Sequence, residues 1–412
     1  MKRNRSLALL AAVAVVMAAL VWWDRRRPST EEAARQHERI LPGFDRAAAT
    51  EITVDRAGVT TQLRHEASGW WLVAPRRRAD DGAVEALLAV LEEGQIERRL
   101  AVVDEPLRQR LGLAAPRARV HVAGRTLTIG GDDPSRGVYL MRDGEPGALV
   151  AEHRLVETAD LDPRLWRSMR LGLREPADAA RLAYGESWAL ERRGGWRVTR
   201  PVATRAADAK VDALVQSLSR ARAVRELAAA PAGQGDGVAL LIDGAVEARL
   251  GGACPGAATE TLVARADGAW LCFRTTDLNL VRAPATTFYE RRLFPLRLDD
   301  IVAADVGALH LRREQGSWRI VAPPGAVAPA RDEAVRAWLE PLLAAEARSY
   351  ATAPPGAGTR VRLATSAEEL IATVDGARAR RAGETVTLEL VAAPPLSADP
   401  MPLRAAGDLG AR

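Results

Sequence analysis

One turn of the sequence, GGDDPSRG at residues 130–137, combines glycines with two neighbouring carboxylates. Asp132 and Asp133 could bind a cation, because carboxylate and carbonyl oxygens are the ligands that calcium prefers. The corresponding turn further along the chain, GGACPGAA, has no carboxylate. We therefore predict a solvated surface turn and assign no metal ligand to either segment.

The sequence lacks the motifs that carry most enzyme chemistry. The five histidines include no pair at metal-ligand spacing on a helix and no accompanying zincin glutamate. There is no Gly-x-Ser-x-Gly elbow and no phosphate-binding loop with a Gly-Lys-Ser/Thr ending. Gly233, Gly235 and Gly237 alternate but lack the third spaced glycine of a dinucleotide fingerprint. We predict a protein that is not an enzyme, with no catalytic residue, no metal ligand and no cofactor.

The two cysteines of the chain, Cys254 and Cys272, do not have the spacing of a metal motif. Cys254 follows a Gly-Gly turn and Cys272 lies in an apolar strand, so the two could meet across neighbouring strands. A disulfide between them is possible if this part of the chain lies outside the cytoplasm. The alternative is a pair of buried free thiols.

Three stretches share one pattern, in which an alternating segment, a tight polar turn and a second alternating segment follow one another. They read VTTQLRHEASGWWLVAP, SWALERRGGWRVTRP and GALHLRREQGSWRIVAP. Each has a Trp five residues before its final Pro, and the pairs are Trp70 and Pro75, Trp196 and Pro201, and Trp318 and Pro323. Period-two alternation around a turn predicts a β-hairpin, and the proline ends its second strand.

An amphipathic helix is predicted after each hairpin, because apolar residues recur at i, i+3, i+4 and i+7. The three stripes are Val84, Leu87, Leu88 and Leu91; Val211, Leu214, Val215 and Leu218; and Val335, Trp338, Leu339 and Leu342. An aspartate lies three residues before the first valine each time, at Asp81, Asp208 and Asp332. These positions fit the N-cap or first turn of a helix. The recurring Trp rings could line a glycan-binding face, but we predict that they pack each hairpin onto its helix.

The second half of each repeat is also rich in strands. RVHVAGRTLTIGG ends at Gly131 and VALLIDGAVEARLGG ends at Gly252, whereas ELIATVDG around Gly376 follows no Gly-Gly pair. We predict an α+β fold of three repeated units, each an antiparallel β-sheet with a packed amphipathic helix. The predicted ranges are repeat unit 1 at 45–170, repeat unit 2 at 171–297, a reduced repeat unit 3 at 298–393 and a flexible tail at 394–412.

An apolar segment near the N-terminus, LALLAAVAVVMAALVWW at residues 7–23, carries no charge. At 1.5 Å per residue it spans roughly 26 Å, near the lower limit for a bilayer core. We predict a single-pass transmembrane helix that contacts the lipid bilayer, preceded by a cytoplasmic stub at 1–6 and followed by a linker at 24–44 with a short helix. The bulk of the chain would lie in the periplasm, anchored to the cell inner membrane. A cleaved signal peptide is the alternative.

The charge pattern does not indicate a nucleic-acid partner. The 58 basic and 53 acidic residues are interleaved along the 412-residue chain, which leaves a net charge of only +5. Nucleic-acid-binding proteins usually gather basic residues on one stripe. The densest basic cluster, residues 25–27, instead follows the apolar segment.

Several of these motifs together resemble a known family. They are the hairpin ending in W-x-x-x-x-P, the Asp-led helix, the step LGLAAP at residues 111–116 and the strand ending in Ile-Gly-Gly. The sequence resembles the bacterial domain of unknown function family 4340 over residues 45–300, and more weakly to 393. Such proteins are typically envelope proteins encoded beside exporter-type ABC transporter subunits.

The resemblance implies a function but supplies no active-site residue. It implies a non-enzymatic, membrane-anchored, extracytoplasmic accessory or scaffold protein of an ABC-type transport or envelope complex. Its partner would be a membrane protein such as an ABC permease. The alternative from another class is a cell-wall glycan-binding protein or an envelope hydrolase.

Overall fold

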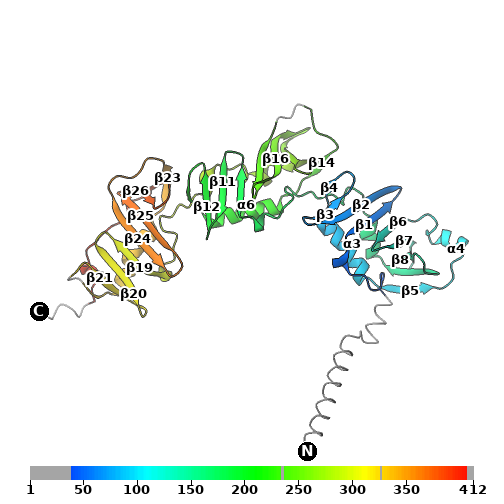
Figure 1. Cartoon of the computed structure of the whole chain (residues 1–412), viewed down its shortest axis with the longest axis horizontal. Coiled ribbons are helices and arrows are strands. Elements are labelled where there is room, and N and C mark those ends of the chain that lie inside the picture. The colour runs from blue at the N-terminus through cyan, green and yellow to red at the C-terminus, as the bar shows by residue number, and fades with distance from the viewer. Residues whose placement is uncertain (1–38, 233–235, 325–326, 406–412) are drawn as a thin grey trace, which may run out of the picture. The chain divides into compact units, whose positions relative to one another are not determined.

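The computed structural model describes residues 39–232, 236–324 and 327–405 (Figure 1). The chain divides into two compact units, Met1–Met169 and Arg170–Arg412. The first unit contains one nine-stranded antiparallel sheet and the second contains two. The predicted antiparallel sheets with packed helices are present, but strands far outnumber helices. The α+β description is therefore too rich in helix, and the fold is mostly β.

The first sheet is built from two meanders joined side by side. Its strand order is β4-β3-β2-β1-β6-β7-β8-β9-β5. The strands are β1 (Glu51–Arg56), β2 (Val59–Glu66), β3 (Gly69–Leu72), β4 (Arg77–Arg78), β5 (Ile96–Leu100), β6 (Ala118–Val122), β7 (Arg125–Asp132), β8 (Gly137–Arg142) and β9 (Ala148–Glu152). The helices are α3 (Asp81–Glu93), α4 (Glu105–Arg110) and α5 (Arg154–Ala159).

The second and third sheets repeat the same order of nine strands. The second sheet contains β10 (Arg181–Tyr184), β11 (Trp188–Arg192), β12 (Trp196–Arg200), β13 (Thr204–Arg205), β14 (Arg225–Leu227), β15 (Val238–Ile242), β16 (Ala245–Cys254), β17 (Ala257–Arg265) and β18 (Trp270–Arg274), with helix α6 (Asp208–Arg220). The third contains β19 (Ile301–Val306), β20 (Leu309–Glu314), β21 (Ser317–Ala322), β22 (Ala328–Pro329), β23 (Ala347–Ala351), β24 (Thr359–Thr365), β25 (Glu369–Asp375), β26 (Arg378–Arg381) and β27 (Thr387–Leu390), with helix α7 (Asp332–Leu343). Short 3-10 helices lie at Arg46–Ala48, Pro176–Asp178, Thr275–Leu278, Ala285–Phe288, Leu298–Asp300 and Met401–Leu403.

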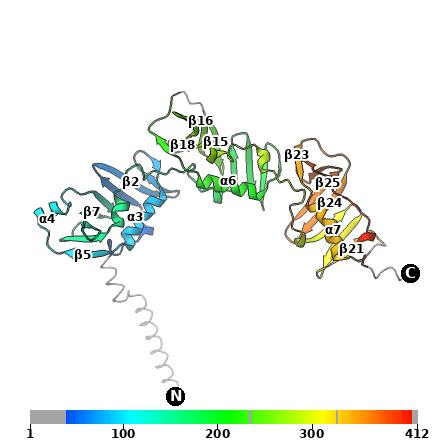
Figure 2. The same cartoon turned by 180° about the vertical axis from the view of Figure 1, so that it is seen from behind.

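The long helix of each repeat connects the two edges of its sheet. Helix α3 follows the edge strand β4 and leads to β5 at the opposite edge, so it crosses one face of the sheet. Helices α6 and α7 occupy the same place in the other two sheets (Figure 2). Tight turns join the meander strands. Ala57 and Gly58, between β1 and β2, both have positive φ angles (48° and 79°), which suits a two-residue hairpin turn.

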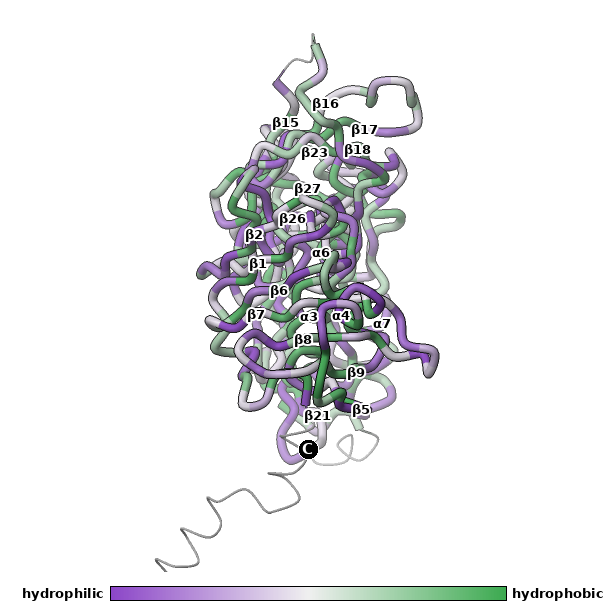
Figure 3. The backbone as a smooth tube through the Cα atoms, turned by 90° about the vertical axis from the view of Figure 1, so that its right-hand side faces the viewer, coloured by the Kyte–Doolittle hydropathy of each residue, from purple (hydrophilic) through white to green (hydrophobic). Residues whose placement is uncertain are grey.

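The core lies between each helix and the sheet face that it covers. Along β1, Ile52 and Val54 are buried whereas Glu51 is exposed, and hydrophobic and hydrophilic residues alternate in the same way along other strands (Figure 3). All four predicted apolar residues of α3 are buried in this core. Val215 of α6 and Trp338 of α7 are only partly buried, so the predicted stripes of those two helices are slightly too wide.

The third repeat, which we predicted to be reduced, has all nine strands. The third repeat lacks the Gly-Gly pair, whose role in the first sheet is visible in the structure. In the first sheet, a Cβ on Gly130 would lie 2.4 Å from the carbonyl oxygen of Leu111, because the loop that carries α4 packs closely on β7. In the third sheet the corresponding connection is the short segment 352–358, which carries no helix. The close contact with Leu111 is therefore a feature of the first sheet.

Of the tail predicted at 394–412, residues 406–412 lie outside the described residues, whereas residues 403–405 bond to the third sheet. The Arg331 amide donates to the Leu403 carbonyl (2.8 Å), the Ala405 amide donates to the Pro329 carbonyl (3.1 Å), and the Leu403 side chain is buried. The same closure occurs in the other repeats, where the Asp80 amide donates to the Trp166 carbonyl (2.9 Å) and the Ala207 amide donates to the Phe288 carbonyl (2.8 Å). Residues 403–405 complete the edge of the third sheet through backbone hydrogen bonds and one buried side chain. Contacts of this kind produce no periodic pattern in the sequence.

The N-terminal predictions lie almost entirely outside the described residues. These are the stub at 1–6, the transmembrane helix at 7–23 and most of the linker at 24–44. The described end of that linker packs into the first core, because Ile40 and Leu41 are fully buried. Within residues 39–232, 236–324 and 327–405, no helix has the length and apolarity needed to cross a membrane.

Candidate functional site

The recurring Trp and Asp residues meet in every repeat. The Trp side chains are 3%, 3% and 4% exposed at Trp70, Trp196 and Trp318. The backbone amide of each Trp donates to an oxygen of the repeat's Asp, over 3.4 Å to Asp81, 3.0 Å to Asp208 and 3.2 Å to Asp332. Each Asp is the first residue of its helix, so the contact connects the hairpin to the helix start.

The prolines that follow these Trp residues share one backbone feature. The peptide bonds before Pro75, Pro201 and Pro323 are all cis. Each lies between the second hairpin strand and the short edge strand that precedes the helix. The three buried Trp rings therefore offer no exposed stacking surface for a sugar, and these positions serve the fold.

A second recurring contact was missed from the sequence. The last residue of β8, β17 and β26 is an arginine that is almost fully buried, and these residues are Arg142, Arg265 and Arg381. Each pairs with a carboxylate in the following turn, at Glu145 (2.9 Å), Asp267 (2.7 Å) and Glu384 (2.9 Å). We call these three pairs the arginine clamps.

Each arginine clamp also contacts the backbone where its own repeat begins. Arg142 donates to the Ile40 carbonyl (2.8 Å), Arg265 to the Arg170 carbonyl (3.0 Å) and Arg381 to the Leu293 carbonyl (3.0 Å). Burial lowers the pKa of Arg142, although the nearby Glu145 opposes this effect. The clamp therefore connects the first residues of a repeat to its last hairpin. The sequence signal that could have located the clamps is an arginine followed by an acidic residue two or three positions later.

The two carboxylates of the 130–137 turn are occupied by the protein's own donors. The two Nη atoms of Arg117 each donate to a carboxylate oxygen of Asp132 at 3.0 Å. Asp133 is buried and accepts bonds from the Ser135 hydroxyl, the Ser135 amide (3.0 Å) and Arg98 (2.5 Å). Bonds from the Ser135 and Tyr139 hydroxyls lower the pKa of Asp133 to about 2. This arrangement stabilises the turn and does not present a set of open carboxylate ligands.

The two cysteines are joined in a disulfide. The Cys254 and Cys272 sulfur atoms lie 1.98 Å apart and their Cα atoms 5.9 Å apart. The bond connects β16 to β18, which are the two neighbours of β17. With Leu262 they form a small buried cluster against which Leu227 and Trp270 pack.

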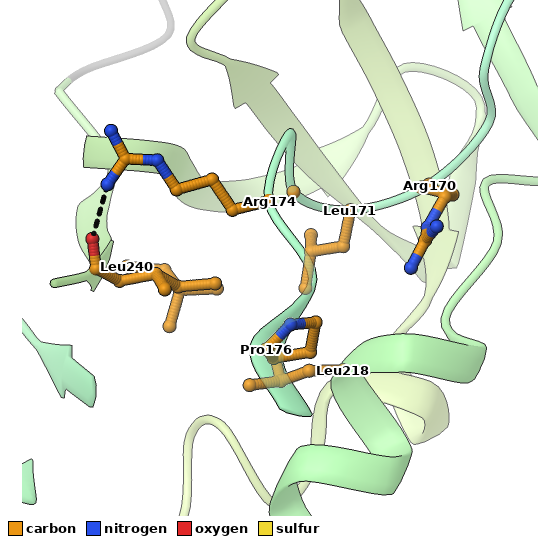
Figure 4. A pocket seen from close by; sticks show the side chains of 8 residues that line it. Arg170, Leu171, Arg174, Pro176, Leu218 and Leu240 are labelled. Atoms are coloured by element: carbon orange, nitrogen blue, oxygen red, sulfur yellow. Dashed lines mark hydrogen bonds between the residues drawn. The ribbon is translucent and has the colours of Figure 1, made fainter. Parts of the chain in front are cut away.

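A small apolar cavity lies near the start of the second repeat. Its volume is only about 10 Å³, which is the room of about one water molecule. Leu171, Pro176 and Leu218 lie close together in its wall, and Arg174 extends away to donate to the Ile242 carbonyl (3.2 Å; Figure 4). The space is too small for an organic ligand.

A larger cavity, of about 250 Å³, lies between the second and third sheets of the second compact unit. The second sheet contributes Arg197 of β12 and Arg205 of β13, and the third contributes Glu369, Leu370, Ile371, Arg381, Ala382 and Glu384. The two sheets are joined beside it by bonds from the Thr204 hydroxyl (2.8 Å) and the Arg205 amide (2.9 Å) to the Glu384 carboxylate.

Comparison with known proteins yields one match. Residues 70–235 match the family model described as Domain of unknown function (DUF4340). No curated protein and no solved structure matches the chain. The matched range begins at Trp70 and includes the contacts of Trp70 with Asp81 and of Trp196 with Asp208. This match over residues 70–235 confirms the resemblance to domain of unknown function family 4340 that the sequence indicated.

Proposed function

We propose that this protein is a non-enzymatic, membrane-anchored accessory or scaffold protein of an ABC-type transport or envelope complex. Residues 7–23 would anchor it to the inner membrane as a single-pass helix, with the bulk of the chain in the periplasm. Its partner would be a membrane protein such as an ABC permease. The observation that carries the proposal is that the recurring Trp, Asp and Arg residues of all three repeats are used within the fold.

The outer faces of the sheets support a binding role. In the first sheet, the face turned away from α3 carries Arg64, Arg119 and His121, whose side chains alternate with the buried core residues. Because the recurring residues pack within each repeat, we expect a partner protein to be recognised by the exposed residues that differ between repeats. A scaffold that holds several partners needs surfaces of this kind.

The disulfide and the N-terminal segment support the location. Disulfides persist in the periplasm and are rare in the cytoplasm, and the Cys254–Cys272 bond fits the former. The apolar segment at 7–23 has about the length that a bilayer core requires.

A pair of reporters fused to the C-terminus of the full chain tests the orientation. We expect an alkaline phosphatase fusion, which needs an oxidising compartment, to be active, and a fluorescent protein that folds only in the cytoplasm to be dark. Replacing Val15→Arg in the apolar segment should release the protein from membranes, whereas Val15→Leu should not. A bright cytoplasmic reporter would reject the proposed orientation.

Affinity purification of the tagged full chain from its own membranes tests the partner. We expect an ABC permease to co-purify after mild cross-linking, and the Val15→Arg variant to lose it. Saturable binding of the purified chain to cell-wall glycan, or cleavage of that glycan, would instead favour the glycan-binding or hydrolase alternative.

A further inference from the structure

The cavity of about 250 Å³ between the second and third sheets contains more positive than negative charge. Each acidic residue at its wall already has its own arginine. Glu384 pairs with Arg381 (2.9 Å), and Glu369 pairs with Arg362 (2.8 Å). The neighbouring Glu368 pairs with Arg205 (2.8 Å).

The N–H donors of the buried Arg381 are all bonded to other groups of the protein. Its Nε donates to the Leu293 carbonyl, its Nη1 to Glu384 and its Nη2 to the Glu290 and Arg292 carbonyls. It therefore shapes the cavity wall but has no donor left for a ligand.

Arg197 differs from the other arginines of this wall. It lies directly opposite Arg205 in the register of β12 and β13, and two positive charges at paired positions on neighbouring strands repel each other. Arg205 is compensated by Glu368, but Arg197 makes no ion pair with any residue in the described part of the chain. One uncompensated guanidinium thus faces the cavity.

We propose that this cavity binds a carboxylate on a short carbon chain, with Arg197 as the principal cation. A guanidinium matches a carboxylate with two parallel hydrogen bonds, and a second arginine stands beside it. Leu370, Ile371 and Ala382 give the cavity an apolar side that suits a few methylene groups. The volume is slightly below that of usual organic-ligand sites, so the occupant is small.

Such a carboxylate could belong to a free dicarboxylic acid or to an acidic side chain of a partner protein. The chemistry at Arg197 is the same in both cases. The inference does not depend on the membrane anchor or on the proposed transport partner, and its test can fail while those proposals stand.

Calorimetric titration of the full-length protein, purified in detergent, tests the site. Glutarate and an oligoglutamate peptide are the probes, and the uncharged glutaramide is the chemical control. We expect saturable binding of at least one acidic probe and none of glutaramide. Tighter binding of the peptide would assign the carboxylate to a partner protein, and tighter binding of glutarate to a free ligand.

Three variants locate the binding. Arg197→Gln should weaken binding by about tenfold or more, whereas Arg249→Gln, an exposed arginine on β16 of the same sheet, should not change it. Ala382→Phe should abolish binding by filling the cavity without altering its charge. Circular dichroism would verify that each variant is folded. The proposal is overturned if wild type binds neither acidic probe up to about 10 mM, or if Arg197→Gln and Ala382→Phe bind like wild type.

Discussion

The second and third sheets both contain the arginine clamp and the hairpin–helix contact, which we call the shared frame, but they differ at one end. In the second sheet, Leu262 lies opposite Cys272, and the disulfide with Cys254 makes this end apolar and cross-linked. Leu262 lies three residues before the clamp arginine of the second sheet. In the third sheet, the residue three positions before the clamp arginine is Arg378, which lies opposite Glu389. The clamp and the hairpin–helix contact are therefore common to both sheets, whereas the residues at this end are not.

The clamp turn of the third sheet also has a second role. Glu384 accepts a bond from the Arg205 amide on the edge of the second sheet (2.9 Å), and the Thr385 amide donates to the Ala203 carbonyl (3.0 Å). A residue pair that closes one repeat thereby connects it to the repeat before it. The clamp turn, which all three repeats contain, thus also forms a contact between repeats without an additional helix or strand.

The largest effect is expected from breaking the shared frame. Arg381→Ala and Arg265→Ala each leave a buried carboxylate without its cation, so each should destabilise its sheet by about 3–5 kcal/mol. Urea denaturation followed by Trp fluorescence measures this. Arg249→Ala is the matched surface control, expected within about 0.5 kcal/mol of wild type. Wild-type stability in either clamp variant would show that the frame is not shared.

Removing the disulfide sharpens the difference between the two outer ends. The bond closes a loop with a sequence separation of 18 residues, so Cys254→Ser combined with Cys272→Ser should cost about 3 kcal/mol. Reductant should destabilise wild type to a similar extent and leave the double variant unchanged. Equal melting of wild type with and without reductant would contradict the structural role of the bond.

A smaller effect is expected from the hairpin–helix contact. Asp208→Ala and Asp332→Ala each remove the acceptor for a Trp amide at a helix start, which should cost about 1 kcal/mol in each sheet. Thermal denaturation measures the shift. Asp212→Ala, an exposed position on α6, is the control. A loss in only one sheet would mean that this contact is not equivalent in the two repeats.

The smallest effect on stability is expected in the first sheet, and it depends on pH. The pKa of Asp133 falls from 3.8 to about 2 on folding, so its contribution to stability is present above pH 3.8 and is lost as the pH falls toward 2. The equivalent turn in the second sheet has no carboxylate. Asp133→Asn should flatten the acid dependence of the first unit's unfolding. An unchanged acid transition would contradict the assigned pKa.

Contacts that are local in sequence could be predicted. Alternation around a turn located the hairpins, and the 3.6-residue period located α3, with Asp81 at its start. The contact between Asp81 and the Trp70 amide was not predictable, because the Trp–Asp separation differs between repeats and the donor is a backbone group.

Contacts between the two ends of a repeat were not predictable. Arg142 reaches the Ile40 carbonyl across 102 residues, and a carbonyl leaves no mark in the sequence. The closing role of Leu403 was missed for the same reason, since one buried side chain has no period. Arg197 was missed because a chain rich in arginine gives no sign of which guanidinium lacks a counter-ion.

The closing segments also determine the order in which a repeat can be finished during synthesis. The strand β22 is complete only when residues 403–405 arrive, long after the helix and hairpin have left the ribosome. Until then its backbone groups face water and can pair with another nascent chain. The last residues of each copy therefore cover a strand edge that would otherwise be open to pairing with another chain.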